Sequence, residues 1–141
     1  MYLQQLRSIL SQGDIFAQID LIDSASPKSP LQPYDVIVLS HTCEIVKPSN
    51  SVVLVCVIKS LSQMDSARRG NVQRNRAYNA MYLESTGTLP ESFIDFRYTF
   101  RVNKESLEEA VRRDLKIASL NDKAQLALAA SFYRFLIRKI S

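Results

Sequence analysis

The sequence predicts an α+β fold, mainly β, in which a small, partly closed antiparallel barrel is closed by a C-terminal helix. Three observations predict this fold class. The 141 residues suffice for one domain, and 46% of them are hydrophobic, which is enough for a core. Short β-branched runs separated by turn residues predict about five or six strands. The last segment has helical spacing. An open α+β sheet packed on the last helix is the alternative architecture.

The N-terminal segment predicts a short helix followed by a strand. Apolar residues spaced three and four apart predict the helix over residues 3–10, and Gly13 would end it. Alternating apolar and polar residues predict a strand over 14–22. The Ser- and Pro-rich residues 24–33 should form an extended loop, because proline cannot donate a backbone hydrogen bond.

A hairpin of two buried strands is predicted to form the centre of the fold. A β-branched run covers residues 36–46, the turn cluster 47–51 follows, and residues 52–58 form the second run. Both runs are almost continuously apolar, which is typical of central strands buried on both faces.

The two cysteines are expected to face each other in this hairpin. If the turn pivots between Ser49 and Asn50, Cys43 lies opposite Cys56, as two reduced thiols. A pivot on Ser49 alone would instead put them on opposite faces of the sheet.

The following segments complete the barrel. Residues 61–76 predict a helix or a long loop, and residues 80–84 a short strand. Residues 92–102 alternate as a half-buried strand. The face expected to point inward carries Ile94, Phe96, Tyr98, Phe100 and Val102. The opposite, exposed face carries Asp95, Arg97 and Arg101. Asn103 is a candidate N-cap for a helix over 104–113, and residues 116–120 predict a brief strand.

The C-terminal helix is predicted from Asp122 to Lys139, with Asn121 as its N-cap. Its apolar stripe consists of Leu126, Ala129, Ala130, Tyr133, Leu136 and Ile137. A stripe at helical spacing usually packs against a core, so we expect these residues to be buried; a partner surface is the alternative.

One basic segment stands out from an otherwise balanced chain with a formal charge of +4. Its arginines are Arg68, Arg69, Arg74 and Arg76, and Tyr78 follows them. Guanidinium groups bind phosphates and an aromatic ring stacks on bases, so the segment is a candidate nucleic-acid-binding site. A solvated helix face or a mobile surface loop is the alternative.

The candidate catalytic residues lie in Ser40–Glu44, which contains the only histidine. In a strand, His41 and Cys43 would share one face, so the thiol could be a nucleophile beside the imidazole. His41 is the acid–base candidate, and Thr42 or Ser40 could orient a phosphate. The alternative is a buried cysteine that only packs, beside a hydrogen-bonded histidine.

Several classes of protein are not expected. No apolar run approaches the length of a membrane span, and the N-terminus does not resemble a secretory signal, so we expect a cytoplasmic protein. No cysteine or histidine spacing is typical of a metal site, and no phosphate-binding glycine loop is present. We therefore expect no metal and no cofactor.

The layout resembles the MazF/PemK toxins of bacterial toxin–antitoxin pairs. The resemblance is carried by Gly13-Asp14-Ile15 at the start of a strand, Val38-Leu39-Ser40 at the end of a buried strand, and the closing helix. It implies an SH3-like barrel, usually a homodimer, that cuts single-stranded RNA without metal and is neutralised by an antitoxin. The small hydroxyl residues of that family match Ser40 and Thr42, but its Arg-Pro is replaced here by Gln32-Pro33.

Three functions follow as hypotheses. The first is a MazF/PemK-like protein that binds single-stranded RNA, as a toxin-like endoribonuclease if it is catalytic. The second is a non-catalytic protein-interaction module, an accessory subunit of a bacterial or phage system. The third is a thiol-dependent enzyme that uses Cys43 and His41. The catalytic hypotheses expect the arginine segment to share one hollow with Ser40–Glu44.

Overall fold

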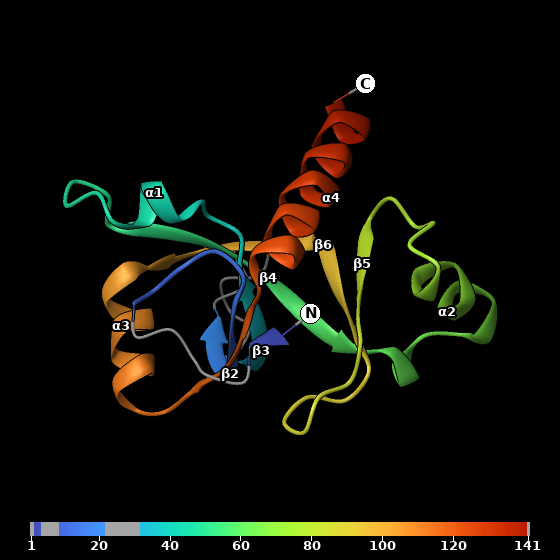
Figure 1. Cartoon of the computed structure of the whole chain (residues 1–141), viewed down its shortest axis with the longest axis horizontal. Helices are drawn as coiled ribbons and strands as arrows, with labels where there is room; N and C mark the ends of the chain where they lie inside the picture. Colours follow the sequence, from blue (N-terminus) through green and yellow to red (C-terminus); the bar gives the residue numbers. More distant parts are fainter. Residues whose placement is uncertain (1, 4–8, 22–31, 141) are drawn as a thin grey trace.

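The computed structural model describes residues 2–3, 9–21 and 32–140. The elements in chain order are β1 (Tyr2–Leu3), β2 (Asp14–Leu21), β3 (Gln32–Val38), α1 (Thr42–Ile45), β4 (Val52–Ser60), η1 (Leu61–Gln63), α2 (Ser66–Gln73), β5 (Ala80–Leu83), β6 (Ser92–Asn103), α3 (Lys104–Arg112), β7 (Lys116–Leu120) and α4 (Asp122–Ile140). Seven antiparallel strands form one sheet in the order β1-β7-β2-β3-β4-β6-β5 (Figure 1). The predicted α+β class, with a partly closed antiparallel sheet and a C-terminal helix, is confirmed.

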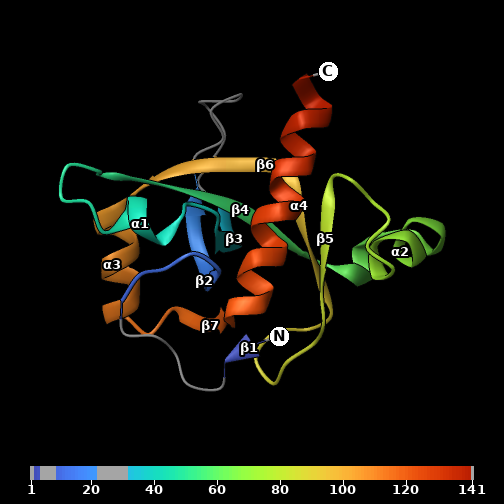
Figure 2. The same ribbon diagram turned by 45° about the horizontal axis from the view of Figure 1, so that its top comes forward.

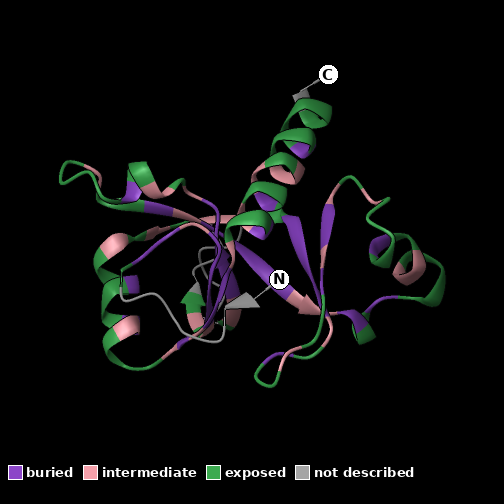
Figure 3. Ribbon diagram, viewed as in Figure 1, coloured by how far each residue is buried: buried purple, intermediate pink, exposed green. Residues whose placement is uncertain are grey.

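The centre of the sheet is buried on both faces, as the apolar runs predicted (Figure 3). Alternate residues of β4 enter two different cores: Val55 joins the core beside α3, and Cys56 joins the core beside α4. A third, smaller core lies between α2 and β5 and includes Val72 and Ala80. Because both faces are covered, β3 and β4 need apolar side chains at nearly every position.

At the N-terminus, the described residues begin with a short strand, β1. Tyr2 and Leu3 pair with β7, and residues 4–8 of the predicted helix lie outside the described residues, as does most of the predicted loop 24–33. Gly13 has a φ of +86°, but it precedes β2 and does not end a helix. The next residue, Asp14, is buried and pairs with Lys116 at 2.9 Å. Its side chain therefore ties the start of β2 to β7.

The hairpin of β3 and β4 is confirmed, but β3 ends at Val38 and the helix α1 follows it. The register pairs Ile37 with Cys56. Cys43 is exposed on α1, whereas Cys56 is buried, so the predicted pairing of the two thiols is wrong. The physical reason is that the chain folds into a helical turn after Ser40 and does not continue the strand.

Strand β6 contains an irregularity that changes which side chains are buried. Its register with β4 shifts between the pairs Cys56–Thr99 and Val57–Asp95. Asp95 is consequently 0% exposed, although the alternation predicted it on the exposed face. Tyr98 is 45% exposed, although it was expected to point inward. Bulges of this kind often redirect side chains next to functional sites.

Helix α4 packs with the opposite face from the one predicted. Its core contacts come from Ala124, Leu128 and Phe135. The expected core stripe is exposed: Leu126 is 74% and Tyr133 is 65% solvent-accessible. The C-terminal end of α4 projects beyond the sheet (Figures 1 and 2). Within the described ranges, no helix has both the length and the apolar character needed to cross a membrane.

Candidate nucleic-acid interface

The predicted catalytic and basic residues do not share a hollow. Helix α1, which contains Thr42 and Cys43, lies beside the start of β4, and α2 follows the end of that strand (Figure 1). Nine residues of β4 separate the two ends, which corresponds to about 30 Å of extended strand. The expectation of one shared site is therefore wrong, because α1 and α2 lie beyond opposite ends of β4.

The Ser40–Glu44 residues mainly serve local structure. His41 is exposed and caps α1, since its Nδ1 accepts a hydrogen bond from the Cys43 backbone at 3.1 Å. The Thr42 hydroxyl accepts the Gln12 backbone N–H at 3.0 Å. No group of His, Cys, Asp and Glu in the described part of the chain could hold a metal ion.

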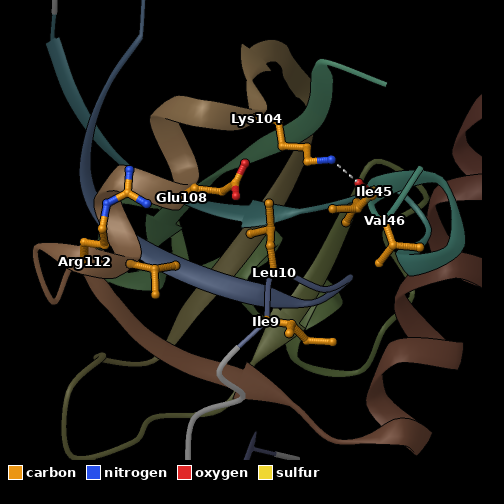
Figure 4. Close-up of a pocket in the computed structure, with 8 residues that line it drawn as sticks. Ile9, Leu10, Ile45, Val46, Lys104, Glu108 and Arg112 are labelled. Atoms are coloured by element: carbon orange, nitrogen blue, oxygen red, sulfur yellow. Dashed lines mark hydrogen bonds between the residues drawn. The ribbon is translucent and has the colours of Figure 1, made fainter. Parts of the chain in front are cut away.

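An apolar groove of about 340 Å³ lies beside α1 (Figure 4). Its apolar lining includes Ile9, Leu10 and Ile45, and Lys104 closes one side by donating to the Ile45 carbonyl at 2.7 Å. His41, Thr42 and Cys43 do not line this groove. The candidate catalytic residues therefore lie outside this groove, and His41 and Cys43 are exposed to solvent.

The basic segment divides into two parts. On α2, Arg68 is exposed, and Arg69 donates to the Met64 carbonyl at 2.8 Å, which anchors the start of the helix. Arg74 caps the end of α2. Only the part after α2, with Arg76 and Tyr78, reaches α4, where it meets cations that the sequence analysis did not select.

Tyr78 and Arg138 both line two hollows. The first, of about 360 Å³, is lined by Tyr78, Arg97, Phe135, Arg138 and Lys139. The second, of about 330 Å³, is lined by Asn75, Arg76, Ala77, Tyr78, Ser131, Arg134, Ile137 and Arg138. We call the first the cationic hollow and the second the amide hollow. Neither has an acidic residue among its described lining residues.

The Tyr78 ring lies close to two side chains of α4 and remains 49% exposed. Its centroid lies 6.3 Å from that of Phe135, with the ring planes 21° apart. The Arg138 guanidinium lies 4.7 Å from the Tyr78 centroid, a cation–π distance. The ring is therefore ordered by its neighbours while part of it stays available to a ligand.

Arg97 is positioned by the buried Asp95 carboxylate. Its Nε and Nη2 donate to the two carboxylate oxygens, each at 3.0 Å. Lys59 Nζ donates to the same carboxylate at 3.1 Å and lies 3.7 Å from the centroid of Tyr98. Burial alone would raise the pKa of Asp95, but the hydrogen bonds from Arg97 and Lys59 outweigh it and lower this pKa. Asp95 thus stays ionised and fixes Arg97 at the edge of the cationic hollow.

Sequence reasoning missed most of this interface. Of the residues selected for nucleic acid, Arg76 and Tyr78 lie in it. They are joined by four further cations, Arg97, Arg134, Arg138 and Lys139. One signal was available, because Arg134, Arg138 and Lys139 lie close together around one turn of the predicted last helix. The contact between that helix and residues 75–78 could not be foreseen from spacing.

No known protein-family model matches the chain, and no curated protein is similar enough to match it. The resemblance to the MazF/PemK toxins therefore stays a prediction.

Proposed function

We propose that this chain binds single-stranded RNA through the Tyr78 interface, defined by Arg76, Tyr78, Arg97, Arg134, Arg138 and Lys139. The observation that carries the proposal is a half-exposed tyrosine ring that lines two hollows, each with three cationic side chains. Proteins that bind single strands combine an aromatic stacking surface with cations that follow the phosphates. Bases in a duplex are already stacked on one another, so this arrangement favours a single strand.

The proposal is for binding and does not extend to cleavage. A toxin-like endoribonuclease would need catalytic groups beside the bound phosphate. His41, Thr42 and Cys43 lie in or directly before α1, which precedes the start of β4, and none of them lines either hollow of the Tyr78 interface.

The test is fluorescence anisotropy of a labelled ten-nucleotide RNA at two salt concentrations. We expect binding at about 50 mM salt that weakens strongly at about 200 mM, because phosphate contacts release counterions. Tyr78→Ala should weaken binding by about fivefold or more, because stacking on one base contributes about 1–3 kcal/mol. Tyr78→Phe keeps the ring and is the matched control. Absence of binding at low salt, or equal affinity for Tyr78→Ala, would contradict the proposal.

A protein-interaction module is the second candidate function, and the exposed stripe on α4 favours it. Leu126, Tyr133, Leu136 and Ile137 are large apolar residues that remain exposed on one helix. Clustered exposed apolar residues often mark an interaction surface. Leu126 lines neither hollow, so Leu126→Glu separates the two functions: it should leave RNA affinity unchanged and should weaken any protein complex formed through α4.

A further inference from the structure

The two hollows beside Tyr78 differ in their chemistry. The cationic hollow places Arg97, Arg138 and Lys139 around two aromatic rings. The amide hollow has as many cations, all of them arginines. It differs because Asn75, Ser131 and Ile137 add an amide, a hydroxyl and an apolar side chain. Amides and hydroxyls form hydrogen bonds with base edges, whereas clustered cations suit phosphate oxygens. Both hollows therefore suit a phosphate, and the amide hollow adds groups that can bond the edge of a base.

Arg97 has the features of a preorganised phosphate ligand. Two of its N–H groups are used by Asp95, and a guanidinium has five. Its side chain remains 47% exposed while this fully buried carboxylate holds it. An arginine already fixed in place loses less conformational freedom when it binds a ligand. Donors therefore remain for an anion in the cationic hollow.

The charge of this hollow distinguishes between kinds of phosphate. An internal phosphodiester carries one negative charge, whereas a phosphomonoester carries about 1.5 to 2 at neutral pH. Three cations line the hollow, and Asp95 balances part of the charge of Arg97 and Lys59. The more highly charged phosphomonoester is therefore stabilised more by the cations of this hollow than an internal phosphodiester of the backbone.

We propose that the cationic hollow is a subsite for a phosphomonoester attached to a nucleotide that stacks on Tyr78, as at the end of an RNA strand. This inference rests on the proposed RNA binding and adds that the protein recognises a phosphorylated terminus. The amide hollow would then hold the base, with Asn75 and Ser131 in position to bond its edge.

The experiment compares RNAs of one sequence with a 5′-phosphate, a 3′-phosphate or no terminal phosphate, each carrying its fluorophore at an unmodified position. We expect one phosphorylated RNA to bind about tenfold more tightly than the unphosphorylated one, as for an added charge-assisted contact. Whether the 5′-phosphate or the 3′-phosphate gives this gain in affinity shows which terminus of the RNA the subsite recognises. A nucleoside monophosphate that competes as well as the oligonucleotide would support the subsite and assign it to free nucleotide.

Matched variants locate the effect. Arg97→Gln and Lys139→Gln should reduce the gain from the terminal phosphate to about twofold or less, because each removes one cation of the hollow. Arg101→Gln, on the same strand but lining neither hollow, should keep the full gain. Lys139 is exposed at the end of α4, so its variant tests the subsite even if Arg97→Gln is poorly folded.

The outcomes also separate this inference from the proposed function. If all three RNAs bind equally well, the phosphomonoester subsite is refuted while RNA binding stands. If none binds at low salt, both fail. If the gain persists in Lys139→Gln and in a folded Arg97→Gln, the phosphate is recognised elsewhere and the subsite is refuted.

Discussion

Replacing Asp95 with asparagine should lower the free energy of unfolding by about 2 kcal/mol at pH 7. The carboxylate is fully buried and accepts hydrogen bonds from Lys59 Nζ and from three N–H groups of Arg97. Hydrogen bonds to charged groups contribute about 1.5–3 kcal/mol each. The side chains of Lys59 and Arg97 are 28% and 47% exposed, so water can replace part of the hydrogen bonding that they lose in the variant. The expected loss of unfolding free energy is therefore well below the sum of the individual hydrogen bonds.

The same variant should change the dependence of stability on pH. The pKa of Asp95 is lowered in the folded protein, so the unfolded chain binds the proton more tightly. The carboxylate therefore contributes stability above the ordinary aspartate pKa of about 4, and this contribution is lost as the pH falls below that value. Asp95→Asn should lose less stability than the native chain between about pH 5 and pH 3.

Urea unfolding followed by far-UV circular dichroism at pH 7, 5 and 3 measures both effects. Glu108→Gln, which removes an exposed carboxylate from α3, is the control and should change stability by no more than about 0.5 kcal/mol. Two results together would refute the reasoning. The free energy of unfolding of Asp95→Asn would lie within about 0.5 kcal/mol of that of the native chain, and the unfolding free energies of both proteins would change in parallel with pH.

Three further predictions concern other parts of the molecule. Iodoacetamide at pH 8 should modify Cys43 but not Cys56 in the folded protein, because burial raises the pKa of the Cys56 thiol to about 12. Mass spectrometry should show one modified cysteine in buffer and two when the protein is unfolded in urea. Leu128→Ala should cost about 3 kcal/mol in urea unfolding, whereas Leu126→Ala on the exposed face should cost less than about 0.5 kcal/mol; equal losses would contradict the packing of α4. Gly13→Ala should lower the free energy of unfolding by about 1 kcal/mol or more in the same assay, because φ is +86° and a methyl group would approach a β7 side chain to 3.0 Å. An unchanged midpoint of urea unfolding would refute this prediction.

The sheet was predictable because its signals are local. The β-branched runs of β3 and β4, the alternation in β2 and the N-cap at Asn121 all follow from neighbouring residues. Helix α1 was not predictable in the same way. Residues 42–45 lack a period that distinguishes a single helical turn from a strand, and the cap formed by His41 requires its backbone geometry to be known.

The faces of α4 show where sequence patterns are insufficient. The helix has apolar residues on both sides, so its spacing allows either Leu126 or Leu128 to face the sheet. The choice depends on Phe96, whose ring lies 5.8 Å from that of Phe135. This contact joins β6 to α4 across more than thirty residues of chain, and no local pattern specifies it.

The candidate interface was only partly predictable for the same reason. Arg76 and Tyr78 stand out by composition, but Arg97 is held in place by Asp95, which alternation placed on the exposed face. The irregular register of β6 overrides that alternation. A local departure from regular strand geometry thus determines which charged groups line the cationic hollow.

The two outermost strands of the sheet bear on how the protein behaves at high concentration. β1 has two residues and β5 has four, so each offers few unpaired backbone groups to a neighbouring molecule. Long exposed margins would act as templates on which further chains could add strands and polymerise. At these two strands, the described part of the sheet therefore offers little backbone to which another chain could add.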